Sequence, residues 1–313
     1  MSPGLWPVLA DIPTTERWDF GGYRYGLEPL TLPAPGSWAP LPARADTAPA
    51  ARMLLVDDFG VPAELAQAPA SADELFWFRW ITGHQVSFIL WRLIGQLAHE
   101  ATQGSRDPVE TVAPLRHYVR GYCSMLLYTA SCSRRTYERV IRPSMRLQHP
   151  AFSGSWAPDF WPVRDLLRGR CTVYTGLAEA AELMAAVKLH QLVHDVVAAR
   201  LVPDGESLLR RSTVRSLDIP MLHLLYDNYF LTVRAVVVED DVVGQLLRRL
   251  VAIARDIEVN GLYPQGDGVD DRAGQRWIAD VAACEVGLTG ILDDVANSAV
   301  RAPGLVVNAR PVA

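Results

Sequence analysis

Apolar residues recur at helical spacing over most of the chain beyond residue 70. The clearest stretch opens with Ser71-Ala-Asp-Glu, a capping box in which the serine oxygen accepts an early helical N–H. A mostly aromatic stripe follows at intervals of three, four or seven residues: Trp77, Trp80, His84, Phe88, Trp91 and Ala98. The pattern predicts a helix over residues 71–102, ended by Gly104, that turns His84 toward the protein interior.

Prolines, glycines and the same periodicity mark the other expected elements. We expect further helices over residues 114–141, 177–202, 207–215, 219–236, 242–259 and 272–295, and a loop region over residues 149–176. The helix over residues 177–202 is rich in alanine, so another group can approach its backbone closely. Credible strand alternation is absent outside short apolar runs such as Val233–Val238.

These elements predict an all-α fold with one domain. Residues 1–70 carry many prolines and little periodicity, which is typical of an irregular N-terminal arm. Residues 71–313 form the expected helical catalytic domain, in which residues 237–313 are a C-terminal helical extension.

Composition removes several classes of protein. Half of the 313 residues are hydrophobic, the net charge is −5, and a basic block of the kind that binds nucleic acid is missing. The apolar runs are too short for a membrane span, and the N-terminus lacks the basic start of a secretory signal. Four scattered cysteines without a CxxC pair suit a reduced compartment. We therefore expect a cytoplasmic protein that contacts neither membranes nor nucleic acid.

Three histidines are candidates for chemistry. On residue type alone, a histidine placed like His84 is more often a hydrogen-bonded core residue than a functional one, although a buried imidazole needs a partner or loses its charge.

His190 and His194 stand four apart on one helical face. A metalloprotease would need glutamate where Gln191 stands, and a zinc pair would need a third ligand. A haem needs one neutral imidazole and room for a flat ring. Spacing alone leaves this choice open.

Three segments, in order, resemble the tryptophan 2,3-dioxygenase superfamily of histidine-ligated haem enzymes. Residues 83–91 read Gly-His-Gln-Val-Ser-Phe-Ile-Leu-Trp, similar to the family's His-Gln followed by Leu-Trp. Residues 129–139 keep the spacing of its Pro-Ala-Ser segment and end at Arg139. His194, with Arg200 six residues later, is similar to its axial His…Arg pattern. The resemblance covers roughly residues 72–236.

The resemblance implies a helical bundle that encloses a haem. His194 would be the axial ligand of the iron, and His84, on the opposite side, would transfer protons. Arg139 would clamp the carboxylate of the substrate, with Arg134 and Ser131 beside it. A relative with covalent haem has cysteine four residues after its axial histidine. Ala198 stands there in this chain, so the resemblance implies non-covalent haem b.

Two departures from the dioxygenase pattern change the expected reaction. The glycine-rich loop over the substrate is reduced to Pro203-Asp-Gly-Glu-Ser, and Cys132-Ser133-Arg134 replaces Gly-Phe-Gln. The N-terminal arm and the C-terminal extension look more like the bacterial haem-dependent tyrosine hydroxylases of natural-product pathways. That resemblance implies hydroxylation of L-tyrosine, or a related aromatic amino acid, at the ring 3-position. The product from L-tyrosine would be 3,4-dihydroxyphenylalanine.

The expected oxidant is hydrogen peroxide, and the expected assembly is a homodimer. One alternative is a tryptophan or indole oxygenase of the same fold that uses dioxygen. Another is a haem-binding sensor without turnover, which would have no need for the carboxylate clamp at Arg139.

Overall fold

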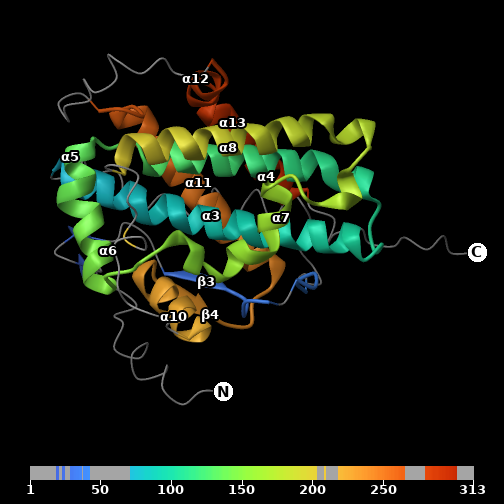
Figure 1. Ribbon diagram of the computed structural model, residues 1–313, viewed down its shortest axis with the longest axis horizontal. Helices are drawn as coiled ribbons and strands as arrows, with labels where there is room; N and C mark the ends of the chain where they lie inside the picture. Colours follow the sequence, from blue (N-terminus) through green and yellow to red (C-terminus); the bar gives the residue numbers. More distant parts are fainter. Residues whose placement is uncertain are drawn as a thin grey trace, which may run out of the picture.

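A computed structural model describes residues 19–20, 23–24, 29–36, 38–42, 71–202, 208, 218–264 and 279–301. These residues are predominantly helical, and long helices run roughly side by side along the longest axis of the molecule (Figure 1). The all-α prediction is therefore confirmed. Among the described helices, none is long and apolar enough to cross a membrane.

The first long helix, α3 (Ala72–Thr102), forms as its sequence predicts. Ser71 caps it, because its Oγ accepts a hydrogen bond from the backbone N–H of Glu74 at 3.2 Å. The helix stops before Gly104, whose positive φ of 71° suits a residue without a Cβ. Most of its side chains are buried, so α3 is the central element of the bundle.

The second long helix, α4 (Pro108–Thr129), begins earlier than predicted. Asp107 caps it by accepting from Val109 N–H at 2.9 Å, and Pro108 occupies the first turn. A proline fits there because the first N–H groups of a helix have no partner within it. The predicted start at Pro114 is wrong, since that proline lies inside the helix.

The predicted helix over residues 114–141 is also wrong at its end. After Thr129 the chain leaves the helix, and Ser131 Oγ donates to the carbonyl of Tyr128 at 2.7 Å. Ser133 Oγ then accepts from Thr136 N–H at 3.1 Å and caps a new helical segment. Such short polar side chains compete with helical hydrogen bonds. Three short elements follow: α5 (Arg134–Thr136), the π-helix η2 (Tyr137–Ile141) and α6 (Arg142–Gln148).

The region predicted as a loop, residues 149–176, contains only short helical turns. They are η3 (Gly154–Trp156), η4 (Pro158–Val163), α7 (Arg164–Leu167) and η5 (Thr172–Tyr174). The turn η6 (Ala178–Ala180) then leads into α8 (Ala181–Leu201), which confirms the helix predicted over residues 177–202. Of the helix predicted over residues 207–215, only Leu208 is described; the rest lies outside the described residues.

Short strands interrupt the helices, contrary to the sequence prediction. The helix predicted over residues 219–236 ends early as α10 (Ile219–Tyr229), and β4 (Thr232–Arg234) follows. β4 pairs in parallel with β3 (Leu30–Leu32) of the N-terminal arm. β1 (Asp19–Phe20) and β2 (Tyr23–Arg24) pair antiparallel. Strands of two or three residues are too short to show an alternating pattern.

The C-terminal helices partly match their predictions. α11 (Glu239–Asn260) contains the predicted residues 242–259. The single helix expected over residues 272–295 is wrong, because the chain divides at Gly287 into α12 (Ala279–Val286) and α13 (Leu288–Val300). Residues 272–278 lie outside the described part of the chain.

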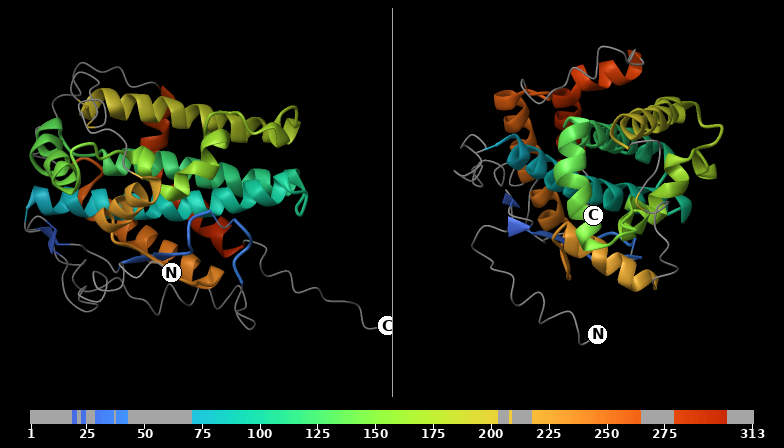
Figure 2. Two further views of the ribbon diagram at one scale, coloured as in Figure 1. Left: turned by 60° about the horizontal axis from the view of Figure 1, so that its bottom comes forward. Right: turned by 60° about the vertical axis from the view of Figure 1, so that its left-hand side comes forward.

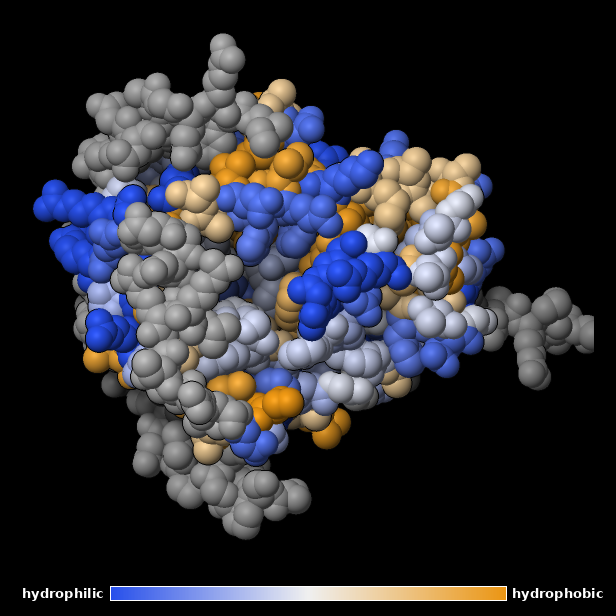
Figure 3. All heavy atoms as spheres, in the orientation of Figure 1, coloured by the Kyte–Doolittle hydropathy of each residue, from blue (hydrophilic) through white to orange (hydrophobic). Residues whose placement is uncertain are grey.

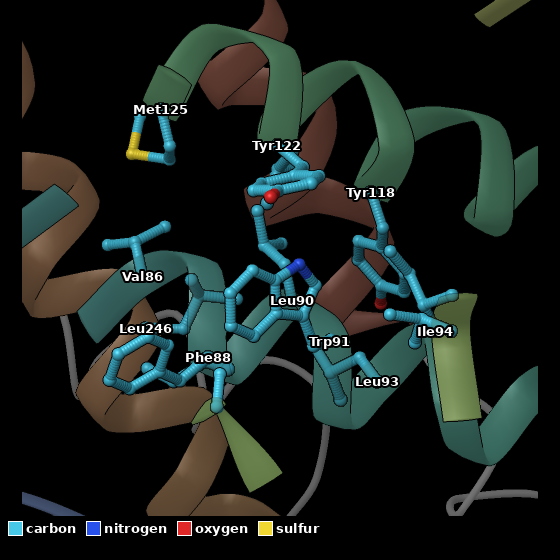
Figure 4. Close-up of a cluster of buried hydrophobic side chains, with 14 of the residues drawn as sticks. Val86, Phe88, Leu90, Trp91, Leu93, Ile94, Tyr118, Tyr122, Met125 and Leu246 are labelled. Carbon is cyan, nitrogen blue, oxygen red and sulfur yellow. The ribbon is translucent and has the colours of Figure 1, made fainter. Parts of the chain in front are cut away.

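The packing of these helices positions the site. α4 packs against α3 on one side and α8 on another, while α11 packs on α3 (Figure 2). α3 lies close to α4 at Gly83, where a Cβ would lie 2.4 Å from Thr129 Cγ2. The residue beside His84 therefore has to be small. Further along the two helices, Trp91 and Tyr122 pack together in the core (Figure 4).

Candidate active site

His84 lies in the middle of α3 with one ring nitrogen fixed. Its Nδ1 is 2.6 Å from the carbonyl oxygen of Trp80, one turn earlier. A carbonyl oxygen only accepts hydrogen bonds, so Nδ1 must carry the proton. In the neutral ring, Nε2 then has the lone pair. This arrangement makes Nε2 the atom of His84 that can accept a proton.

Aromatic rings surround the His84 ring. Phe230 stacks on it with centroids 4.5 Å apart and planes 16° apart, and Trp80 lies 4.2 Å away. Phe88 approaches edgewise at 6.4 Å. Burial lowers the pKa of His84 from 6.5 to about 4, although the hydrogen bond to Trp80 acts in the opposite direction. The imidazole is therefore neutral at neutral pH.

His194 projects from the inward face of α8. On its helical stripe, Leu183, Val187, His190 and Leu201 are buried, whereas Val197 and Ala198 are half-buried. The side chain of His194 is nevertheless 61% exposed, and its Nδ1 lies 3.7 Å from an oxygen of Asp195. The exposed fraction of its side chain shows that His194 faces accessible space. The face of the molecule seen in Figure 3 is hollowed near its centre, below α8.

His190 has the opposite environment. It is buried, and neither ring nitrogen has a hydrogen-bond partner among the described residues. Burial, together with a smaller effect of the neighbouring His194, lowers its pKa to about 4. The ring stacks on Tyr122 at 4.9 Å.

Ring contacts continue from Tyr122 toward α3. Tyr122 meets Trp91 at 5.2 Å, Trp91 meets Phe88 at 5.4 Å, and Phe88 meets His84. The middle of this series is visible in Figure 4. An unbroken row of aromatic contacts thus joins the histidines of α8 to the histidine of α3.

The two arginines expected to bind substrate lie at the surface. Arg139, on the π-helix η2, forms an ion pair with Asp73 in the first turn of α3, and its side chain is 57% exposed. Arg134 pairs with Glu138 at 3.1 Å. Tyr137, on the same π-helix, packs edgewise on Trp80 at 6.2 Å and connects this segment to the His84 cluster. Neither contact tests substrate binding, so both roles stay predictions.

Ser131 belongs to a buried network that sequence reasoning missed. Its Oγ accepts from Arg79 Nη1 at 2.8 Å and donates to the carbonyl of Tyr128. Arg79 also forms a buried ion pair with Asp256 of α11 at 2.8 Å, and Tyr128 donates to that carboxylate at 2.6 Å. The expected role of Ser131 in substrate binding stays a prediction. In the structure, its hydroxyl helps hold α3, α4 and α11 together.

Haem is the cofactor that the sequence resemblance implies, and the donor groups suit it. Among the described residues, no group of three or more histidine, cysteine, aspartate or glutamate side chains gathers to hold a metal ion. A single accessible imidazole, His194, is what a haem iron requires from the protein. The aromatic side chains between α3 and α8 are packed on one another in the core, and His194 lies at the accessible end of this series. The Pro203-Asp-Gly-Glu-Ser turn lies outside the described residues.

Together these features define a helical protein with histidines set among packed aromatic rings. Residues 31–187, half of the chain, match the family described as SfmD 3-methyl-L-tyrosine peroxygenase. The chain belongs to this family, and it is thereby placed among the peroxygenases, which are oxidoreductases. A search of curated proteins found no match.

The family match covers part of the candidate site. His84, Ser131, Arg134 and Arg139 lie within the matched residues. His190 and His194 follow shortly after the match ends at residue 187. The assignment of the α8 histidines therefore rests on their own environments.

Proposed function

We propose that this protein hydroxylates L-tyrosine at the ring 3-position to give 3,4-dihydroxyphenylalanine, with hydrogen peroxide as the oxidant and a non-covalent haem b as the cofactor. Membership of a peroxygenase family supports the oxidant and the class of substrate. The observation that carries the proposal is the state of His84, a neutral imidazole whose Nδ1 is fixed by Trp80 and whose Nε2 has a lone pair.

His194 is the residue that would hold the haem. Its imidazole is accessible, and Asp195 stands 3.7 Å from Nδ1. A neutral imidazole that is open to a ligand can offer a ring nitrogen to the iron. When bound, the haem supplies the oxidising chemistry, while the protein supplies binding, orientation and proton transfer.

His84 would perform the proton transfer. Its Nε2 would accept a proton from one oxygen of hydrogen peroxide and, as the O–O bond breaks, return it to the other oxygen, which leaves as water while the first oxygen goes to the substrate. The low pKa keeps Nε2 free to accept that proton and makes the protonated ring a ready donor. Trp80, Phe88 and Phe230 limit the access of water to this ring, which strengthens the polar contacts that remain.

Arg139 would bind the carboxylate of the amino acid. To do so, its guanidinium would exchange the carboxylate of Asp73 for that of the substrate. Arg134 lies on the preceding turn and would add positive charge nearby. A carboxylate held in this way aligns the ring of the substrate for attack at one position.

A second candidate substrate is 3-methyl-L-tyrosine, because the description of the matching family names it. The test supplies purified, haem-loaded protein with L-tyrosine, 3-methyl-L-tyrosine or L-tryptophan, each with hydrogen peroxide or with dioxygen. We expect products one oxygen atom heavier from a tyrosine with peroxide. Formation of N-formylkynurenine from tryptophan with dioxygen, and no catechol from either tyrosine, would replace this proposal with the indole oxygenase alternative.

A further inference from the structure

Phe230 is the residue whose ring lies flat on His84. The two rings are 4.5 Å apart at 16°, although Phe230 lies more than 140 positions later in the sequence, between α10 and β4. Phe230 also meets Phe88 edge to face at 5.2 Å. Its ring therefore has little freedom to turn away from the imidazole.

The backbone of Phe230 is held by the residue next to His84. Gln85 Nε2 donates to the carbonyl oxygen of Phe230 at 2.9 Å. The other end of the amide, Gln85 Oε1, accepts from Arg249 Nε of α11 at 3.0 Å. Gln85 is buried, so this pair of bonds fixes the amide in one orientation.

The residue after Phe230 adopts an unusual backbone conformation. Leu231 has a φ of +47°, and among the described residues it is the one non-glycine with positive φ. A branched side chain disfavours this region, so the surrounding contacts must impose it. One of them is the hydrogen bond from Leu30 N–H of the N-terminal arm to the carbonyl of Leu231, at 2.9 Å.

The strand β3 of the N-terminal arm is itself held by α11. Gln245 accepts from Thr31 N–H at 2.7 Å and donates to the carbonyl of Thr31 at 2.9 Å. Gln245 and Arg249 are one helical turn apart, so the same helix holds β3 and orients Gln85. Gln85 and β3 therefore both hold the short segment that contains Phe230 and Leu231.

We infer that Phe230 is a positioning residue for His84, held in place by Gln85 and by the pairing of the N-terminal strand β3 with β4 on α11. Stacking of Phe230 keeps the imidazole in the plane in which Nδ1–H points at the Trp80 carbonyl and Nε2 is free. The N-terminal arm and the C-terminal extension thus both serve the histidine. The inference rests on the proposed function only for what His84 does with the proton.

The test observes the His84 ring by NMR in the full chain, which carries isotopically labelled histidine. The signal that disappears in His84→Gln is assigned to His84. The variants are Phe230→Leu, which removes the stack, and Gln85→Leu, which removes the backbone bond without changing any ring. Phe230→Tyr is the conservative variant. Gln96→Leu is the matched control, because Gln96 is a buried glutamine of α3 that donates to Glu100 at 3.1 Å.

In Phe230→Leu and Gln85→Leu we expect the pKa of His84 to rise from about 4 toward 6.5. We also expect the neutral ring to populate both tautomers, because it is no longer held in one orientation. Phe230→Tyr and Gln96→Leu should leave the pKa and the tautomer of His84 as they are in the parent protein. The ionisable side chains that contact this cluster are the same in every variant: Tyr137, Tyr226, Tyr229 and Arg249. Unchanged titration and tautomer in folded Phe230→Leu or Gln85→Leu would overturn the inference. Turnover is measured separately, so an altered titration with unaltered kcat would keep the positioning role and count against the proposed function.

Discussion

The rings of His190 and His194 lie 6.4 Å apart on one face of α8, yet only His190 is buried. His190 fills its space by stacking on Tyr122, whereas His194 faces accessible space beside Asp195. The two histidines therefore differ in their access to a ligand, although they stand on the same face of one helix. A ligand that enters from the accessible side meets His194.

The first prediction concerns the haem ligand. His194→Ala should lose most bound haem, because it removes the accessible imidazole. His190→Ala should keep it, although the loss of the ring that packs on Tyr122 should lower the free energy of unfolding. The measurement is the ratio of Soret to protein absorbance after purification. Equal losses would leave the assignment without support, and loss in His190→Ala alone would reverse it.

The second prediction concerns proton transfer. His84→Gln should slow peroxide-driven turnover by roughly 100- to 10,000-fold, the usual contribution of general acid–base catalysis, while haem content stays the same. The matched control is His99→Gln, which changes an exposed histidine on the same helix. Turnover of His84→Gln at the parent rate would remove His84 from the mechanism.

The third prediction concerns stability against pH. The pKa of His84 is about 4 in the folded chain and 6.5 in the unfolded one, so between these values the unfolded state binds more protons. The free energy of unfolding should therefore fall as the pH drops from about 6.5 to about 4, by about 3 kcal/mol at most from this group. Asp227, whose pKa burial raises to about 6, acts in the opposite direction.

The difference between the parent and His84→Gln isolates this effect, because Asp227 is present in both. Urea unfolding at neutral pH and near pH 4.5 should show a smaller loss in the variant. The same loss in both proteins would mean that His84 titrates normally in the folded state.

The fourth prediction concerns the carboxylate clamp. Arg139→Leu should keep the haem and raise the KM for L-tyrosine by about 30-fold or more, because losing one partner of a desolvated charge pair costs about 2–5 kcal/mol. An exposed pair contributes only about 0–1 kcal/mol, so a change of a few-fold would show that Arg139 stays paired with Asp73 at the surface. Arg134→Leu is the comparison, and a larger effect there would assign the clamp to Arg134.

The fifth prediction concerns Ser131. Ser131→Ala should lower the free energy of unfolding by about 1–3 kcal/mol, because it leaves a buried hydrogen-bond donor of Arg79 without its acceptor. Chemical denaturation measures this loss. Unfolding equal to that of the parent would show that Arg79 finds another acceptor. A parallel rise in the KM for L-tyrosine would assign Ser131 a binding role as well.

Local patterns predicted the parts of the fold that depend on neighbouring residues. The cap at Ser71, the length of α3 and the inward direction of His84 follow from side chains within a few positions of one another. The break after Thr129 was missed, although Ser131 and Ser133 are typical of such breaks, because helical periodicity continues past them.

Contacts between distant segments could not be predicted in the same way. β3 and β4 are about 200 residues apart, and neither is long enough to show a pattern alone. The stack of Phe230 on His84 and the ion pair of Arg79 with Asp256 also join remote positions. For the α8 histidines, the four-residue spacing gave two candidates, and the resemblance to the His…Arg pattern selected His194. Their different environments, His190 packed on Tyr122 and His194 accessible, could not be predicted from that spacing.

In the proposed reaction, hydrogen peroxide supplies the oxygen atom that enters the ring of tyrosine. The most direct measurement supplies haem-loaded protein with L-tyrosine and isotopically labelled hydrogen peroxide under unlabelled dioxygen, followed by mass analysis of the product. We predict 3,4-dihydroxyphenylalanine in which the new hydroxyl carries the label. Unlabelled product would show that the oxygen atom does not come from hydrogen peroxide, and the absence of a catechol from L-tyrosine would show that the protein is not a tyrosine hydroxylase.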